Sequence, residues 1–281
     1  FWIELDNKFY SSKRKIKQFI HSNKTHKDSL FAYVYHANDV SADKVSVEFV
    51  KALQEKPFVI ELTNKKSMLT VASKQSSQTK VIMNDSVFGT INHGFYALIN
   101  SIEKKYITQN VIGIVEGSIK DSFIVVCAHY DHLGMQGQSI YRGANDNATG
   151  TAAMLELAKR FGYTKPKLSL VFIAFGAEEI GLKGSSYFVE HPVFPLSKIK
   201  YVINLDLLGA GSKGITLVNG VEEQELTNKF ILQNKILIHP FPEIKVRKNA
   251  ANSDHFPFTQ KEVSAIFLYS LGSVGGYHHV D

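Results

Sequence analysis

From about residue 109 onward, the chain alternates short apolar runs with segments of helical periodicity. The runs are continuous and rich in β-branched or aromatic residues, which is typical of strands that are buried on both faces. Four runs are predicted strands and two segments are predicted helices: strands at residues 123–128, 168–175, 201–205 and 265–269, helices at about 150–161 and 183–190. This order predicts an α/β three-layer sandwich with a mostly parallel central sheet.

Residues 1–108 have a different character, because their short apolar runs alternate with polar stretches and include no cluster of acidic and histidine motifs. We expect a smaller N-terminal α/β segment there and the main domain over residues 109–281. A chain of 281 residues that is 44% hydrophobic is long enough for one sizeable core and such an appendage. The longest apolar runs are much shorter than the roughly 18 to 20 residues that cross a bilayer. We therefore expect no transmembrane segment.

Cys127 is the only cysteine and lies inside an apolar run. A single cysteine excludes an internal disulfide framework and a thiolate metal cluster. Any metal site must therefore use histidine and carboxylate side chains. The net charge of +6 includes a basic group at residues 13–17, but no nucleic-acid-binding motif accompanies it. We interpret this group as a solvated helix face and expect no nucleic-acid partner.

Acidic and histidine side chains follow the predicted strands at or soon after their carboxyl ends. They are His129, Asp131 and His132, then Asp146, then Glu178 and Glu179, then Asp206, and finally His278 and His279. In open α/β sheets, ligands bind outside the carboxyl ends of the strands, so these side chains are expected to converge. Carboxylates placed together repel one another unless a cation compensates their charge. The pattern therefore predicts a metal site.

Imidazole and carboxylate ligands without thiolate suit a catalytic zinc site. Five protein ligands are too many for one tetrahedral zinc, but they suit two ions that share a carboxylate. Each residue also has an ordinary structural interpretation: His129 as a buried core histidine, Asp206 as a helix cap, and Glu178 and Glu179 as the solvated start of a helix. Five separate segments with the same feature favour the metal site over these alternatives.

Residues 209–214 match the GxGxxG pattern of dinucleotide-binding turns. In those proteins the pattern opens a helix, whereas residues 215–218 are predicted to form a strand here. We therefore interpret the glycines as a turn. The sequence contains no HExxH, GxSxG or phosphate-loop signature.

With these motifs, the chain resembles metallopeptidase family 28, the co-catalytic zinc aminopeptidases, whose relatives include glutaminyl cyclases and the non-enzymatic transferrin-receptor ectodomain. The resemblance covers roughly residue 109 to the end and implies a fold of the zinc-exopeptidase type. It rests on six motifs in the family's order: His129-Tyr130-Asp131, residues 143–150, Glu178-Glu179 with residues 181–185, Asn204-Leu205-Asp206-Leu207, Ser253-Asp254-His255, and Tyr277-His278.

The resemblance implies two zinc ions per chain. Asp146 would bridge them, His129 and Asp206 would complete one site, and Glu179 and His278 would complete the other. Glu178 would be the general base for a metal-activated water. Asp131 resembles the acid that fixes the tautomer of the histidine ligand, and Asp254 and His255 resemble supporting residues near the site.

The resulting expectation is a zinc-dependent aminopeptidase that acts on peptides with a free N-terminus. The alternatives are a zinc acyltransferase of the glutaminyl cyclase type and a non-catalytic binding module like the transferrin receptor. Animal-type cyclases typically place Trp before the last histidine, where this chain has Tyr277, and the only tryptophan, Trp2, lies outside the matched region. The resemblance further implies a divergent protease-associated-like subdomain before residue 109, and similarity to exported bacterial enzymes implies an extracytoplasmic location, periplasmic or secreted.

Overall fold

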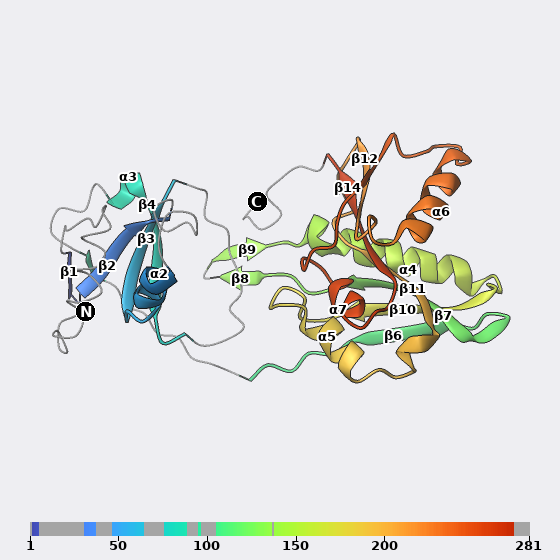
Figure 1. Ribbon diagram of the computed structural model, residues 1–281, viewed down its shortest axis with the longest axis horizontal. Coiled ribbons are helices and arrows are strands. Elements are labelled where there is room, and N and C mark those ends of the chain that lie inside the picture. Colours follow the sequence, from blue (N-terminus) through green and yellow to red (C-terminus); the bar gives the residue numbers. More distant parts are fainter. Residues whose placement is uncertain are drawn as a thin grey trace. The chain divides into compact units, whose positions relative to one another are not determined.

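The computed structural model describes residues 2–5, 31–37, 47–64, 76–88, 95–96, 105–136 and 138–272. These residues fall into two compact units, which divide between Lys105 and Tyr106 (Figure 1). The predicted boundary lies between residues 108 and 109. The interpretation of the first unit as protease-associated-like stays a prediction. None of the helices in the described part of the chain is both long and apolar enough to cross a membrane.

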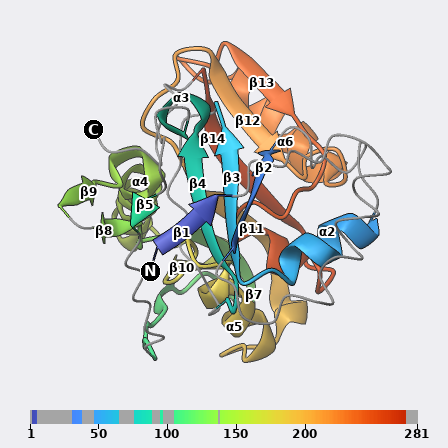
Figure 2. The same cartoon turned by 90° about the vertical axis from the view of Figure 1, so that its left-hand side faces the viewer.

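The first unit contains a five-stranded sheet in the order β4-β3-β2-β1-β5. Its strands run side by side in Figure 2 and are β1 (Trp2–Leu5), β2 (Phe31–His36), β3 (Phe58–Thr63), β4 (Thr79–Asn84) and β5 (Phe95–Tyr96). All neighbours are parallel except β1 and β5. Among its described residues, the helices are α2 (Val47–Gln54) and α3 (Asp85–Phe88). Ile60 and Leu62 of β3 form a buried hydrophobic cluster among the described residues of this unit.

The second unit contains a seven-stranded sheet in the order β13-β12-β14-β11-β7-β10-β6. Its strands are β6 (Val111–Val115), β7 (Ile119–His129), β10 (Leu168–Phe175), β11 (Ile199–Leu205), β12 (Gly214–Val218), β13 (Glu243–Val246) and β14 (Ala265–Leu271). Only the pairs β6 with β10 and β12 with β14 are antiparallel among these described strands. The predicted mostly parallel sheet is confirmed. A separate hairpin consists of β8 (Gly134–Gln136) and β9 (Ser139–Tyr141).

Helices cover the large sheet on both faces (Figure 1). They are α4 (Thr149–Gly162), α5 (Lys183–Glu190), α6 (Gln224–Lys235) and α7 (Phe256–Thr259), with the short turns η2 (Ala144–Ala148) and η3 (Leu196–Lys198). Alternate residues of a strand face opposite sides of a sheet. Along β7, Val125 and Cys127 join a core cluster with residues of α5 and α7, whereas Val126 and Ala128 join a cluster with residues of α4 and α6. Two hydrophobic layers on one sheet make the predicted three-layer sandwich.

Candidate active site

Three neighbouring strands of the second unit end close together. β7 lies between β10 and β11 and is parallel to both. His129, the last residue of β7, pairs with Phe175, the last residue of β10. The segment after β10 carries Glu178 and Glu179, and β11 ends one residue before Asp206. The sheet register therefore brings the acidic segments beside His129, as the sequence pattern predicts.

His129, Asp146 and Asp206 form a buried cluster. Nε2 of His129 lies 3.1 Å from Oδ1 of Asp146 and 3.5 Å from Oδ1 of Asp206. Among the described residues, neither that Nε2 nor Oδ1 of Asp206 has a hydrogen-bond partner. Two donors on one tetrahedral zinc, each about 2.1 Å from the ion, are separated by about 3.4 Å. The atoms of this cluster are therefore spaced like ligands of one metal ion.

The charge of the cluster also calls for a cation. Burial opposes a charge on His129, but Asp131, Asp146 and Asp206 raise its pKa well above the ordinary value. A proton on Nε2 compensates the negative charge of these carboxylates, and a divalent cation held by these residues would do the same.

Asn147 links the loop that carries Asp146 to the end of β11. Its amide nitrogen donates to the carbonyl of Leu205 at 3.0 Å, and its Oδ1 accepts from the backbone N–H groups of Gly150 and Leu207 at 3.0 and 3.3 Å. A side chain at position 150 would overlap Asn147 and the Leu205 carbonyl, so glycine is needed there. The peptide bond between Asp146 and Asn147 is cis. These contacts place Asp146 close to the segment that carries Asp206.

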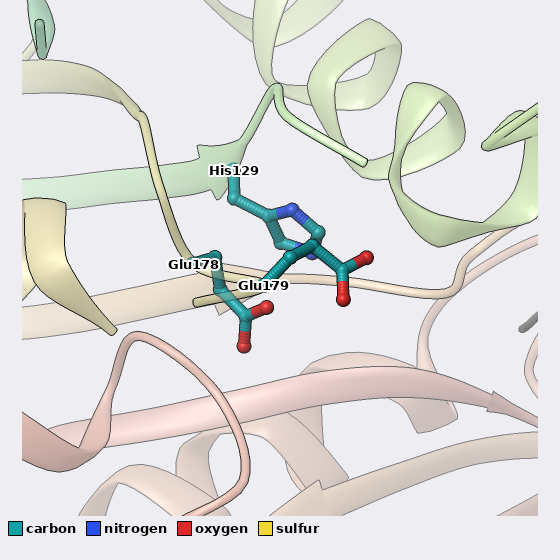
Figure 3. A group of neighbouring side chains, drawn as sticks. All are labelled: His129, Glu178 and Glu179. Atoms are coloured by element: carbon teal, nitrogen blue, oxygen red, sulfur yellow. The ribbon is translucent and has the colours of Figure 1, made fainter. Parts of the chain in front are cut away.

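Asp131 organises the backbone of the two glutamates. Its Oδ1 accepts from the N–H of Glu178 at 3.1 Å, and its Oδ2 accepts from the N–H of Glu179 at 3.2 Å. The preceding residue, Ala177, has a φ of 61°, a left-handed conformation that is costly for a residue other than glycine and is often found at functional sites. As a result, the two carboxylates diverge from one turn beside His129 (Figure 3).

The main-chain carbonyl of Asp131 also lies beside the ring of His129. Nδ1 of His129 lies 3.1 Å from the carbonyl oxygen of Asp131 and 3.7 Å from the Asp131 carboxylate. A carbonyl oxygen only accepts, so Nδ1 carries the hydrogen and the neutral ring presents the lone pair of Nε2. Burial opposes ionisation of Asp131, but His129 and the N–H of Glu178 lower the pKa of this carboxyl below its usual value.

Glu178 and Glu179 each have a ligand atom close to His129, within a group of atoms that all lie within 4.8 Å of one another. Proximity alone does not separate a metal ligand from a general base. Burial raises the pKa of Glu178 to about 9, with the charge of His129 acting in the opposite direction and that of Asp254 in the same direction. A cation nearby would lower this pKa. Burial thus favours the protonated form of Glu178, whereas a nearby cation would favour the ionised form.

A buried chain of hydrogen bonds holds Asp206 from the opposite side. Asn204 donates to Oγ of Ser253 at 2.7 Å, and Ser253 donates to Oδ2 of Asp206 at 2.8 Å. The other oxygen of Asp206 faces His129. A similar contact, from Ser185 to Oδ1 of Asp254 at 2.5 Å, holds the neighbouring acid, whose pKa burial raises to about 7.

We expect Ser253→Ala to weaken metal binding by about 10- to 100-fold, because Asp206 loses the donor that fixes its orientation. The same change should lower the free energy of unfolding of the metal-free protein by about 1 to 3 kcal/mol, since the buried amide of Asn204 loses its acceptor. Competition with a chelator measures the first effect and denaturant unfolding the second. Ser118→Ala, at an exposed serine, is the matched control. Unchanged metal affinity would show that Asp206 is positioned without Ser253.

The structure brings together four of the five predicted ligands, His129, Asp146, Glu179 and Asp206, in overlapping groups. The fifth, His278, lies outside the described residues, as do Tyr277 and His279. The individual roles of these residues stay predictions. His132 has no predicted role, although its Nδ1 lies 2.8 Å from Oε1 of Glu179. Its position three residues after His129 was the available signal.

The sequence matches the family model described as peptidase family M28 over residues 110–281. The chain belongs to peptidase family M28. The resemblance that the motifs indicated is thereby confirmed, and the match covers most of the second structural unit.

Curated relatives in this family include an aminopeptidase of Bacillus subtilis, 34% identical over 171 residues, and an aminopeptidase of Pseudomonas aeruginosa, 32% identical over 127 residues. The first match covers 58% of this chain and 36% of the relative, the second 44% and 23%. The chain thus spans only about a third or less of the length of these relatives.

Solved structures of M28-type fold are also similar. A zinc aminopeptidase from Bacillus subtilis has a TM-score of 0.62 at 22% identity, and the match covers 99% of this chain and 68% of the chain of that enzyme. An aminopeptidase from Aneurinibacillus has a TM-score of 0.61 at 19% identity, and the match covers 92% of this chain and 65% of the chain of that aminopeptidase. At these identities, the two likenesses establish the zinc-exopeptidase type of fold.

Proposed function

We propose that the protein is a zinc-dependent aminopeptidase that hydrolyses N-terminal residues from peptides. The observation that carries the proposal is the cluster of His129, Asp146 and Asp206, whose buried donor atoms face one another, together with Glu178 beside it. Relatives of the M28 family that are named as aminopeptidases, and a solved structure described as a zinc aminopeptidase, support both the reaction and the metal.

The proposal includes two zinc ions per chain. His129 and Asp206 would hold one, Glu179 and His278 the other, and Asp146 both. The position of Asp146 supports this sharing, because it belongs to the group with His129 and Asp206 and also to a group with His132 and Glu179. When bound, zinc would act as a Lewis acid on the peptide carbonyl and lower the pKa of the attacking water.

Glu178 would carry the proton in the reaction. It accepts a proton from the attacking water as the water oxygen bonds to the carbonyl carbon, and it gives that proton to the leaving amine as the C–N bond breaks. Its environment supports both steps, because burial favours the protonated form and a nearby cation favours the ionised form. The acidic groups around it would also attract the ammonium group of a free N-terminus, which favours exopeptidase action.

Metal analysis and product analysis together test the proposal. Elemental analysis of the purified full chain should find close to two zinc ions per chain. A panel of aminoacyl-anilides should be hydrolysed with release of the amine. Protein that binds no divalent metal when zinc is supplied would overturn the enzyme proposal and support the non-catalytic binding module.

The glutaminyl cyclase alternative requires a separate product measurement, because it uses much the same acid and histidine framework. A glutaminyl peptide is incubated beside the anilides, and ammonia release is followed separately from amine release. We expect amine release without ammonia. Ammonia with a pyroglutamyl product, and no hydrolysis of any anilide, would establish a cyclase.

We further propose an extracytoplasmic location. The bacterial aminopeptidase relatives are consistent with it, whereas several fungal relatives are named vacuolar membrane proteases. Fractionation of the source cells, followed by immunodetection of the protein, decides between the compartments.

A further inference from the structure

Glu179 is held by two neighbouring residues that follow the β7 strand. Asp131 accepts a hydrogen bond from the backbone N–H of Glu179 at 3.2 Å. His132 contacts the side chain, with Nδ1 at 2.8 Å from Oε1. Both side chains of this second contact are nearly buried, at 10% exposure for His132 and 6% for Glu179. A hydrogen bond in such surroundings is stronger than one in water.

The imidazole of His132 is also fixed in place. A β-carbon at Gly143 would lie 2.8 Å from Cβ and 2.9 Å from Cγ of His132. Gly143 has a φ of 68°, a left-handed conformation that glycine adopts without strain. The backbone just before Asp146 can therefore pack directly against His132, which limits the rotation of its ring.

His132, Asp146 and Glu179 have possible ligand atoms that all lie within 4.8 Å of one another, but the 2.8 Å distance between His132 and Glu179 favours a hydrogen bond over two ligands of one ion. Two donors on one tetrahedral zinc lie about 3.4 Å apart, and the contacts of His129 with Asp146 and Asp206, at 3.1 and 3.5 Å, are close to that value. The contact of His132 with Glu179 is shorter than either. A carboxylate oxygen accepts, so Nδ1 of His132 carries the hydrogen and donates it.

We propose that His132 is a positioning residue for the second metal site. By donating its Nδ1–H to Oε1 of Glu179, it holds in place a carboxylate that would bind the metal. This inference rests on the proposed zinc site, in which Glu179 is a ligand. It also accounts for the spacing of the motif, since His129 serves one ion directly and His132 serves the other through Glu179.

The test compares His132→Leu with His132→Asn in the full chain. The amide nitrogen of Asn lies close to where Nδ1 of histidine lies and can donate to Oε1, but an amide is a poor zinc ligand. Leu offers no donor. Zinc dissociation constants are measured by competition with a chromogenic chelator. We expect His132→Leu to weaken binding of one zinc ion by about 10- to 100-fold, and His132→Asn to recover most of that loss.

Two controls accompany this comparison. His191→Leu, at an exposed histidine after α5, should leave zinc affinity unchanged. Melting temperatures of the metal-free proteins identify variants that do not fold, and His132→Ala provides a second variant without a donor and with less bulk.

The outcomes separate the inference from the proposed function. Equal loss in the Leu and Asn variants would make His132 a metal ligand and overturn the positioning role. Wild-type affinity in both variants, with zinc binding and peptidase activity intact, would overturn the role of His132 alone. Wild-type protein that takes up no zinc would overturn the proposed function, and this inference with it.

Discussion

Glu178→Gln is expected to lower kcat by about 10²- to 10⁴-fold while the zinc content stays at the wild-type level. Glutamine keeps the size of the side chain but cannot take a proton from water. The backbone N–H of Glu178 still donates to Asp131, so the turn that carries the pair is retained. Steady-state kinetics on an aminoacyl-anilide, with elemental analysis of the same sample, measures both effects.

The neighbouring substitution, Glu179→Gln, separates the two roles. It should lose zinc, because a neutral amide is a much weaker zinc ligand than a carboxylate, even though the amide oxygen can still accept the hydrogen bond from His132. Glu190→Gln, at an exposed glutamate on α5, is the matched control and should change neither quantity. Loss of zinc from the Glu178 variant and not from the Glu179 variant would reverse the assignment of base and ligand.

The central elements of the second unit could be predicted from the sequence because their burial is complete. β10 is buried along most of its length, so its continuous apolar run of residues 168–175 marks both of its ends. β6 was not predicted, although it pairs with β10. It lies at the edge of the sheet, and Val111 and Ile114 are more than half exposed. An edge strand is partly exposed to solvent and can have polar residues at many positions, so its hydrophobic pattern is weak.

The helix α6 was missed for a related reason. Only Leu226 and Thr227 are buried among its residues, so it has no broad apolar stripe that a helical period would reveal. The β8–β9 hairpin is short, with Met135 and Ile140 paired and largely exposed. Hydrophobic patterns in a sequence arise from buried residues, and these elements have few buried residues.

In the candidate site, the proposed metal-binding and catalytic residues could be predicted from the sequence, but the residues that support them could not. Acids and histidines at strand ends were recognisable because parallel strands bring their carboxyl ends together. The supporting contacts were not, since they join residues far apart in the chain: His132 to Glu179, and Ser253 to Asp206. A serine or histidine of this kind has no periodicity of its own, and its role follows from the sheet register that places its partner beside it.

Asp146→Asn should have a larger effect on metal than any other single substitution in the cluster. Asp146 lies 3.1 Å from His129 and belongs both to the group with Asp206 and to the group with Glu179. Loss of its charge is therefore expected to weaken the binding of both proposed zinc ions, whereas Asp206→Asn is expected to weaken the binding of only one. We expect less than one zinc ion per chain in the Asp146 variant and about one in the Asp206 variant.

The same substitution should lower kcat/KM by at least about 10³-fold, because metal-derived stabilisation of the transition state amounts to several kcal/mol and each 1.36 kcal/mol is about tenfold in rate. Added zinc should raise the melting temperature of the wild-type protein, since it binds only the folded state, and should fail to raise that of Asp146→Asn. Asp121→Asn, at an exposed aspartate in β7, is the control for loss of a negative charge. An Asp146 variant that keeps two zinc ions would show that this carboxylate is not shared, and the metal site would then have to be built on His129, Asp206 and Glu179 without a bridge.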